Sequence, residues 1–371
     1  MTKLRKSYRP FYILIFDFMK NSKTVLVAPL NWGLGHATRC IPIIRGLLAE
    51  NFTPVIASDG IALQLLQKEF PDLETITLPD YQIEYAKKGK NFKLKMLKDS
   101  PKMLKAIAKE KKIVKKLVKE RDFCGIISDN RLGVYSKKVP SVFITHQLNV
   151  LSGATTWFSS KIHQRIIKKF DECWVPDVAK KPNLSGKLGH LKKHSLSLKY
   201  IGPLSRLKVQ ELPIVYDLMV ILSGPEPQRT MLEEKLFEEV KHFDGNVLFI
   251  RGKLASTQEK FQFLNCEVVN FMQSEQLEKA FNESAFVLSR SGYTTVMDLA
   301  KLNKKAFFIP TPGQFEQEYL AKRLQKQQLV PTATQDDFSI DQLKRVKDFK
   351  GLSAFNYQED YAALFHLFQG K

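Results

Sequence analysis

Residues 286–300 read FVLSRSGYTTVMDLA and give the clearest indication of the fold. A short apolar run, 286–289, is followed within three residues by Gly292 and then by apolar residues at helical spacing over 295–302. A strand, a tight glycine turn and a helix in that order form one unit of a parallel sheet whose face the helix covers. The stretch therefore predicts an α/β fold.

The same alternation of short apolar runs and amphipathic stretches continues along the whole chain. The predicted strands are 24–29, 53–57, 74–78, 125–128, 141–145, 172–175, 217–222, 247–251, 267–270, 286–289 and 306–309. Residues 202–213, rich in proline and glycine, separate two sets of strands and are the expected linker. We predict two doubly wound, Rossmann-like domains facing each other across a cleft, 19–203 and 204–371. Residues 1–18 would be an N-terminal extension, and the last helix could pack back on the first domain.

Positive charge is confined to the first half of the chain. The 371 residues carry a net charge of +20, with 58 Lys and Arg against 38 Asp and Glu. Up to Pro203 there are 37 basic and 16 acidic residues, and beyond it 21 and 22. The stretch from Lys87 to Arg121 alone has 15 basic and 3 acidic residues. This asymmetry predicts that the first half meets an anionic partner.

Apolar residues within the stretch from Lys87 to Arg121 recur at helical spacing, at 103/104/107 and 113/114/117/118. A basic amphipathic helix of this kind suits an anionic membrane surface. The alternative is a surface helix whose apolar side packs on the sheet. No nucleic-acid partner is expected, because the stretch has a single Phe for stacking and no recognised binding motif.

Composition excludes several other classes of protein. With 44% apolar residues and 26 Phe, the chain is not predicted to be largely disordered. The four Cys show no metal-binding spacing, which argues against a disulfide scaffold and a zinc site. No apolar run approaches the length of a membrane span. We expect a cytoplasmic protein, able to lie on the inner face of the membrane, with no metal site.

Two candidate catalytic residues follow strands of the first half. The strand at 24–29 runs into LNWGLGHATR, in which Gly33 and Gly35 let the backbone approach a ligand at a helix start. His36 would open that helix, where a neutral imidazole could take a proton from a hydroxyl; a helix-capping His is the alternative. Asp129, at the end of another strand, is a second candidate base or a partner of His36, unless it caps a helix.

Two strand-to-helix turns of the second half are suited to an anion. Ser223 with Gly224, and Ser291 with Gly292, would each present backbone N–H groups at a helix start. Asp298, about two turns into its helix, could accept hydrogen bonds from two ribose hydroxyls, although a solvated helix carboxylate is common. Residues 310–318 add polar side chains that could read sugar hydroxyls.

The segments SRSGYTTVMDLA and FFIPTPGQFEQEYLA together resemble the donor-binding region of GT-B glycosyltransferases, most closely those of the MurG type. NWGLGHATR resembles the glycine-rich first loop of that family. The segment ending in His146, Gln147 and Asn149 resembles its acceptor-side HExN motif, with Gln147 in place of Glu. Residues 202–206 resemble its linker, which ends in a phosphate-contacting Arg, and LSGPEPQR resembles its phosphate turn.

The resemblance implies inverting transfer of a sugar from a UDP-linked donor, such as UDP-N-acetylglucosamine, to a hydroxyl of a lipid-linked or cell-envelope acceptor. No cofactor is implied beyond the nucleotide sugar itself. The catalytic residues would be His36 and Asp129. The implied donor-binding residues are Arg206, Ser223, Gly224, Met272, Ser291, Gly292, Asp298 and Gln317. Those on the acceptor side are Gly33, Gly35, His146, Gln147 and Asn149.

Departures from the family pattern keep other functions open. The phosphate turn has lost a glycine and gained two prolines, and Gln147 replaces a carboxylate, which suggests a different acceptor. A UDP-sugar hydrolase could use the same His36 with water as the acceptor. A non-hydrolysing sugar epimerase and a non-catalytic module that binds nucleotide sugars or nucleic acid are weaker alternatives.

Overall fold

The computed structural model describes residues 23–81, 92–224, 226–352 and 360–370, and only the backbone of 92–100. The extension expected at 1–18 and the start of the basic stretch at Lys87 lie outside the described residues, as does Pro225 of the second phosphate turn.

The first half contains a seven-stranded parallel sheet. Its strands are β1 Lys23–Pro29, β2 Phe52–Ser58, β3 Thr75–Thr77, β4 Phe123–Asp129, β5 Ser141–Ile144, β6 Glu172–Val175 and β7 Leu198–Tyr200. They lie in the order β3-β2-β1-β4-β5-β6-β7. The direction in which the chain fills the sheet reverses between β1 and β4, so the loops that leave these two strands diverge and open a crevice at their carboxyl ends.

Alternate residues of β1 pack on opposite faces of this sheet. Val25 and Val27 belong to the hydrophobic cluster that contains α2 Gly35–Ala49 and α3 Gly60–Glu69. Leu26 and Ala28 belong to the cluster that contains Val114 of α4 Phe92–Glu120. The short helix η2 Gly153–Thr155 leads into α5 Thr156–Ile167, which ends in a cluster with β5 and β6. Apolar residues on both faces of a strand are what a parallel sheet covered by helices requires.

The second half contains a six-stranded sheet in the order β10-β11-β9-β8-β12-β13. Its strands are β8 Tyr216–Ile221, β9 Val247–Ile250, β10 Lys260–Phe263, β11 Cys266–Val269, β12 Ser284–Ser289 and β13 Lys305–Phe308. The β10–β11 hairpin is antiparallel and the other pairs are parallel. The helical segments are α6 Gln228–Glu239, η3 Val240–His242, α7 Ser274–Asn282, α8 Tyr293–Lys301, α9 Phe315–Lys326 and η4 Ile340–Asp348.

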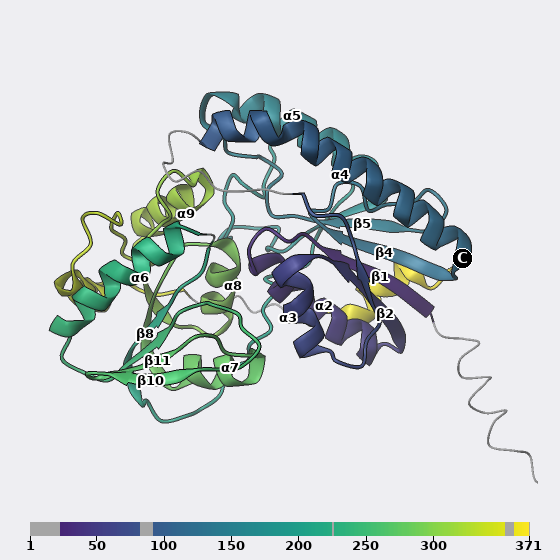
Figure 1. The fold of residues 1–371 in the computed structure, drawn as a ribbon. Helices are drawn as coiled ribbons and strands as arrows, with labels where there is room; N and C mark the ends of the chain where they lie inside the picture. The colour runs from purple at the N-terminus through teal and green to yellow at the C-terminus, as the bar shows by residue number, and fades with distance from the viewer. Residues whose placement is uncertain (1–22, 82–91, 225, 353–359, 371) are drawn as a thin grey trace, which may run out of the picture.

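The two halves meet along α2 and α8, which lie opposite each other in the middle of Figure 1. One hydrophobic cluster includes residues of both helices, among them Cys40 of α2 and Met297 of α8. The chain then returns to the first half, where α10 Tyr361–Phe365 and η5 His366–Phe368 pack on its sheet (Figure 1). A Cβ added to Gly125 of β4 would lie 2.1 Å from the ring of Phe368, so this return depends on a residue without a side chain.

The predicted α/β fold class is confirmed, whereas the prediction for the apolar stripe of the basic helix is corrected. Val114 is fully buried, and Ile113, Leu117 and Val118 pack with it on the sheet rather than facing outward. The lysines of α4 from Lys102 to Lys119 are exposed, and Leu104 is 63% exposed. Helical spacing predicts that a helix has an apolar face, but it does not predict which surface covers that face.

None of the helices in the described ranges is long and apolar enough to cross a membrane.

Candidate functional site

The glycine-rich loop after β1 touches the start of α8 in the other half. The hydroxyl of Thr294 donates to the carbonyl of Gly35 at 3.1 Å. A Cβ added to Gly35 would lie 2.9 Å from the Thr294 Oγ1 atom, so only glycine permits this approach without a shift. The loops from the two sheets therefore meet at one place.

The two predicted catalytic residues, His36 and Asp129, lie together at this place. Pairing of β1 with β4 sets Pro29 beside Asp129, and α2 begins just beyond the loop that follows Pro29. His36 Nδ1 is 2.8 Å from Asp129 Oδ1. Asp129 is fully buried, and the His36 side chain keeps 15% exposure. The cap position of α2 is occupied by Leu34, and Asp129 is followed by a turn, so neither residue caps a helix.

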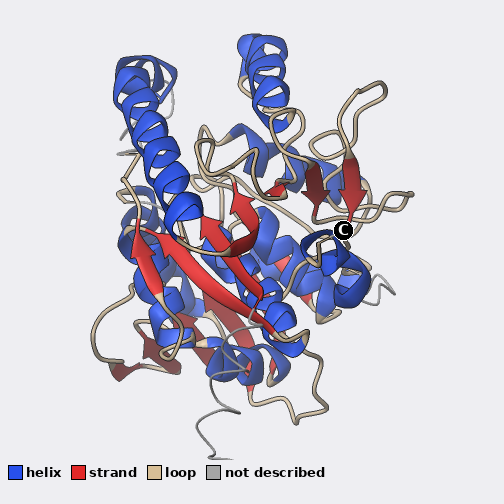
Figure 2. Ribbon diagram, turned by 90° about the vertical axis from the view of Figure 1, so that its right-hand side faces the viewer, coloured by secondary structure: helices blue, strands red, loops and turns tan. Residues whose placement is uncertain are grey.

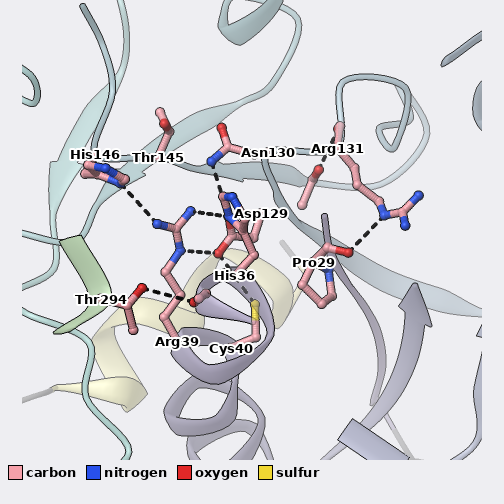
Figure 3. Close-up of polar contacts among 12 residues, drawn as sticks. Pro29, His36, Arg39, Cys40, Asp129, Asn130, Arg131, Thr145, His146 and Thr294 are labelled. Carbon is pink, nitrogen blue, oxygen red and sulfur yellow. Dashed lines mark hydrogen bonds and ion pairs between the residues drawn. The ribbon is translucent and has the colours of Figure 1, made fainter. Parts of the chain in front are cut away.

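Arg39, one turn further along α2, was not predicted and binds both residues. It is 2% exposed, and its Nε and Nη2 groups donate to the two oxygens of Asp129 (Figure 3). Burial, the largest single effect, would raise the pKa of Asp129, but the charges and hydrogen bonds of Arg39 and His36 together outweigh it and lower that pKa to about 2. The pKa of His36 is lowered, first by burial and then by Arg39, although Asp129 opposes both effects. Asp129 is therefore an anion and His36 a neutral imidazole at neutral pH.

A chain of contacts continues from Arg39 across to the second half. Arg39 Nη1 lies 3.1 Å from His146 Nδ1, and His146 Nε2 lies 2.7 Å from Glu316 Oε1 on α9. Gln147 Nε2 donates to the other oxygen of Glu316. Burial raises the pKa of Glu316, but His146, Arg39 and His36 together outweigh burial, so the net shift of this pKa is downward. Glu316 was missed because its partners belong to the other half of the chain.

Tyr293 and Asn149 hold the loops around His146. The Tyr293 ring stacks on the His146 ring with centroids 4.1 Å apart and 10° between the planes. The Tyr293 hydroxyl donates to the carbonyl of Pro176 at 2.8 Å. Asn149, predicted on the acceptor side, donates through its side chain to the carbonyl of Lys187 at 2.5 Å. In the structure Asn149 braces a loop of its own half rather than joining the cluster at His146.

The turn before α8, at Ser291 and Gly292, can offer backbone N–H groups rather than side chains to an anion. The Ser291 hydroxyl is buried and donates to the Gln317 carbonyl at 2.8 Å. The carboxamide oxygen of Gln317 accepts from Thr311 N at 2.8 Å, so these two side chains hold the starts of α8 and α9 together. Gly292 caps α8, and a Cβ added there would meet no heavy atom within 4 Å.

The other turn predicted to bind an anion, at Ser223 and Gly224, also has open space in front of it. Ser223 and Gly224 are exposed, and a Cβ on Gly224 would likewise meet no atom within 4 Å. Gly224 has a φ of +101°, a conformation that side-chain-bearing residues rarely adopt.

Arg290, immediately before Ser291, is a buried cation that sequence patterns did not identify. Its Nη groups donate to the carbonyls of Gln228, Ile309 and Pro310 and to Gln335 Oε1, at 2.6 to 3.2 Å. These partners are neutral, and burial lowers the pKa of Arg290 to about 9. Its Nε atom is buried without a hydrogen-bond partner in the described parts of the chain. A cation behind two helix starts makes this turn favourable for an anion.

Asp298 and Arg206 lie near the linker between the halves. Asp298 Oδ1 accepts from the Ser205 hydroxyl at 2.6 Å, and burial raises the pKa of Asp298 to about 6. Arg206 donates to Ser274 Oγ at 3.1 Å and lies 3.4 Å from Glu69 Oε1 of α3, so its nearest anion is a protein carboxylate. The charge of Arg206 also acts on Asp298.

Met272 is half-buried and packs against the hydrophobic cluster shared by the two halves. The preceding carbonyl, that of Phe271, accepts from Gln258 Nε2 at 2.7 Å. Among the described residues, no group of three or more His, Cys, Asp and Glu side chains is arranged to hold a metal ion.

Comparison with known proteins adds family evidence to this geometry. Residues 226–352 match the family model of the glycosyltransferase family 28 C-terminal domain. The UDP-N-acetylglucosamine–N-acetylmuramyl-(pentapeptide) pyrophosphoryl-undecaprenol N-acetylglucosamine transferase of Haemophilus ducreyi is 24% identical over 221 residues. That match covers 58% of this chain and 59% of the relative, so the chain spans about three-fifths of the length of that protein.

Solved structures match over more of the chain. MurG of Acinetobacter baumannii has a TM-score of 0.55 at 14% identity, covering 94% of this chain and 99% of that one. LpCGTa in complex with UDP has a TM-score of 0.59 at 12% identity, covering 92% and 93%. The resemblance expected from the motifs is confirmed: the fold is that of the GT-B glycosyltransferases, the chain is similar to proteins of the MurG type, and residues 226–352 match the family 28 C-terminal domain.

Proposed function

We propose that the protein is an inverting glycosyltransferase that moves a sugar from a nucleotide sugar to an acceptor hydroxyl. The observation that carries this proposal is the His36–Asp129 pair, at 2.8 Å, beside the glycine loop that touches the start of α8. A base in one half thus lies next to an open anion-binding turn of the other half, at Gly292. The match of residues 226–352 to a glycosyltransferase domain supports the same activity.

In the proposed reaction His36 is the general base. Two groups lie 2.8 Å from His36 Nδ1: the Asp129 carboxylate, which only accepts hydrogen bonds, and Arg39 Nη2, which only donates them. We assign the Nδ1 hydrogen to the bond with Asp129, so that the Nε2 lone pair is left to take the proton of the acceptor hydroxyl. The hydroxyl oxygen then bonds to the anomeric carbon from the face opposite the leaving group. The bond from that carbon to the phosphate oxygen breaks, and the nucleoside diphosphate leaves with the electron pair.

Fixed dipoles and one buried cation would stabilise the departing diphosphate. The starts of α6 and α8 would present backbone N–H groups near Gly224 and Gly292, with Ser223 and Ser291 in the same turns. The buried charge of Arg290 behind these turns has only neutral partners and would be balanced by the diphosphate. Arg206, whose charge acts on Asp298, would add to this field from the linker.

We propose a UDP-linked donor, such as UDP-N-acetylglucosamine. The support is the family 28 match and the donor in the name of the relative from Haemophilus ducreyi, UDP-N-acetylglucosamine. Asp298 would accept from the ribose hydroxyls, with Ser205 holding one of its oxygens, and the backbone near Met272 would face the uracil. Gln317 and the loop that it braces at Thr311 would adjoin the sugar.

We propose that the acceptor is a lipid-linked or cell-envelope glycan, reached at the cytoplasmic face of an anionic membrane. The lysines of α4 from Lys102 to Lys119 are exposed, and α5 lies at the same end of the molecule (Figures 1 and 2). On α5 the side chains of Trp157 (72%) and Phe158 (62%) are exposed. Cations around exposed aromatic side chains suit the headgroup region, where each Lys contributes about 1 kcal/mol. No nucleic-acid partner is proposed.

Calorimetric titration with UDP, GDP and dTDP tests the donor site. We expect UDP to bind, and the Asp298→Asn variant to bind it at least about tenfold more weakly, because a charged hydrogen-bond acceptor is lost. The absence of binding by all three nucleotides would contradict the proposal. Incubation with UDP-sugars alone then separates transfer from hydrolysis, since rapid UDP release without an acceptor would indicate a hydrolase.

A further inference from the structure

Arg39 has no role in the proposed reaction, yet it contacts Asp129, His36 and His146. It follows His36 by three positions on α2, so both side chains lie on the same face of the helix. Its guanidinium donates to both oxygens of Asp129 and reaches His146 Nδ1 at 3.1 Å (Figure 3). Its Nη2 atom is also 2.8 Å from His36 Nδ1, because both groups converge on the Oδ1 atom of Asp129.

Hydrogen-bond chemistry determines the state of His146. A guanidinium has donors and no acceptor, so the Nδ1 atom of His146 must present its lone pair to Arg39. The proton of a neutral His146 is then on Nε2, where it is donated to Glu316 Oε1 at 2.7 Å. Arg39 therefore selects the tautomer of His146 that can bond to the other half of the protein.

The same guanidinium acts on His36 through charge. The charged and titratable groups around His36 are Arg39 on its own helix, Asp129 on β4, His146 after β5 and Glu316 on α9. The thiol of Cys40, 3.7 Å from Asp129 Oδ2, belongs to the same cluster. Because Arg39 already pairs with both oxygens of Asp129, a proton added to His36 would create a second cation beside a carboxylate whose charge is balanced.

We propose that Arg39 is a positioning residue that holds the Asp129 carboxylate, keeps His36 in its neutral, proton-accepting form and fixes His146 in the tautomer that bonds to Glu316. This inference rests on the proposed function only in taking His36 as the base. Arg39 touches no reacting atom and acts through the two histidines. One residue thereby links the base to the contact between His146 and Glu316 across the two halves.

Nitrogen-15 NMR of histidine-labelled protein tests the proposal without substrate. In the wild type we expect His146 to be protonated on Nε2 alone, and His36 to be neutral at pH 6.5. In Arg39→Met the titration midpoint of His36 should rise by about 1 to 3 units, because a cation within about 4–6 Å has been removed. Arg39→Lys retains the charge and should keep the midpoint low while His146 loses its single tautomer.

Arg45→Met is the matched control, because Arg45 lies on the same helix and is largely exposed; it should leave both histidine signals unchanged. A His36 midpoint that does not move in folded Arg39→Met would overturn the proposal. If that variant does not fold, the wild-type spectrum decides, since a charged His36 at pH 6.5 or an Nδ1-protonated His146 would also overturn it. These spectra do not depend on activity. The proposed sugar transfer can therefore be refuted while the positioning role of Arg39 stands, and the role of Arg39 can be refuted while the proposed transfer stands.

Discussion

Replacing Asp129 by Asn would remove one charge from the centre of the site while keeping the shape of the side chain. Asp129 is fully buried and accepts from two nitrogens of Arg39 and from His36 Nδ1. The amide retains one acceptor and leaves Arg39 buried without a counterion. Breaking a buried ion pair in this way costs about 3–5 kcal/mol of folding stability.

The pKa of Asp129 gives an independent measure of the same interaction. The pKa falls from 3.8 to about 2, which corresponds to roughly 2–3 kcal/mol at about 1.4 kcal/mol per unit. Because this pKa is lower in the folded protein, the stabilisation is present above about pH 4 and is lost as the pH falls toward 2. We therefore expect Asp129→Asn to lower the free energy of unfolding at pH 7 by about 2–5 kcal/mol, measured by urea denaturation.

The same substitution should reduce turnover much more than stability explains. His36 would lose the acceptor that orients its ring and fixes its tautomer, a change that costs about 10²–10⁴-fold in comparable acid–base pairs. Initial rates of UDP release from a UDP-sugar, measured on folded protein, give this number.

Asp177→Asn is the control, because Asp177 is another fully buried Asp of the first half and pairs with His190 at 3.2 Å. It should lose comparable stability and less than about tenfold in rate. The reasoning is refuted if Asp129→Asn turns over as fast as the wild type, or if both variants lose the same factor in rate.

Three other predictions concern the donor turn, the ribose carboxylate and the basic helix. Gly292 has a φ of −67° and open space in front of it, so Gly292→Ala should leave stability unchanged. The added methyl group should crowd the phosphates and weaken UDP binding about tenfold or more. An unchanged calorimetric affinity would place the diphosphate elsewhere. Asp298 has a pKa of about 6, so UDP affinity should rise between pH 5 and pH 7, and in Asp298→Asn the affinity should not change with pH. The stability that Asp298 contributes to the fold should fall as the pH rises from about 4 to 6, because its pKa is raised in the folded protein. A flat wild-type profile would remove Asp298 from the ribose site. Glu110→Ala would leave Arg131, now 2.6 Å from Glu110 Oε1, with fewer hydrogen-bond acceptors in a buried site, at a cost of about 1–3 kcal/mol; hydrogen exchange in α4 should increase, and unchanged protection would show that this contact does not anchor the helix.

Much of the fold could be predicted because the strands are short apolar runs bounded by glycine, proline and polar residues. The prediction of a strand at 286–289 lies within β12, and the helix predicted over 295–302 overlaps α8. β7 and β10 were missed, because each has only three or four residues, and β10 is largely exposed and polar. Periodicity depends on burial of one face, and such short edge strands bury little.

The site could be predicted only in part. His36 and Asp129 follow strands of the parallel sheet, so both could be identified as candidates, but their contact depends on β1 lying next to β4. Arg39 and Glu316 are charged residues on helices, a pattern that usually indicates a solvated surface. Arg39 is buried against Asp129 and His146 of its own half, and Glu316 meets His146 and Gln147 across the two halves. Single-sequence patterns carry no information about either contact.

Sugar transfer with His36 as the base is tested most directly by following radiolabelled UDP-N-acetylglucosamine in the presence of anionic phospholipid vesicles that contain a bacterial lipid extract. The account predicts that the wild type moves label into the lipid fraction, and that His36→Ala does so at least about 100-fold more slowly while still binding UDP. Equal rates for the two proteins would contradict it, as would release of the label only as free sugar.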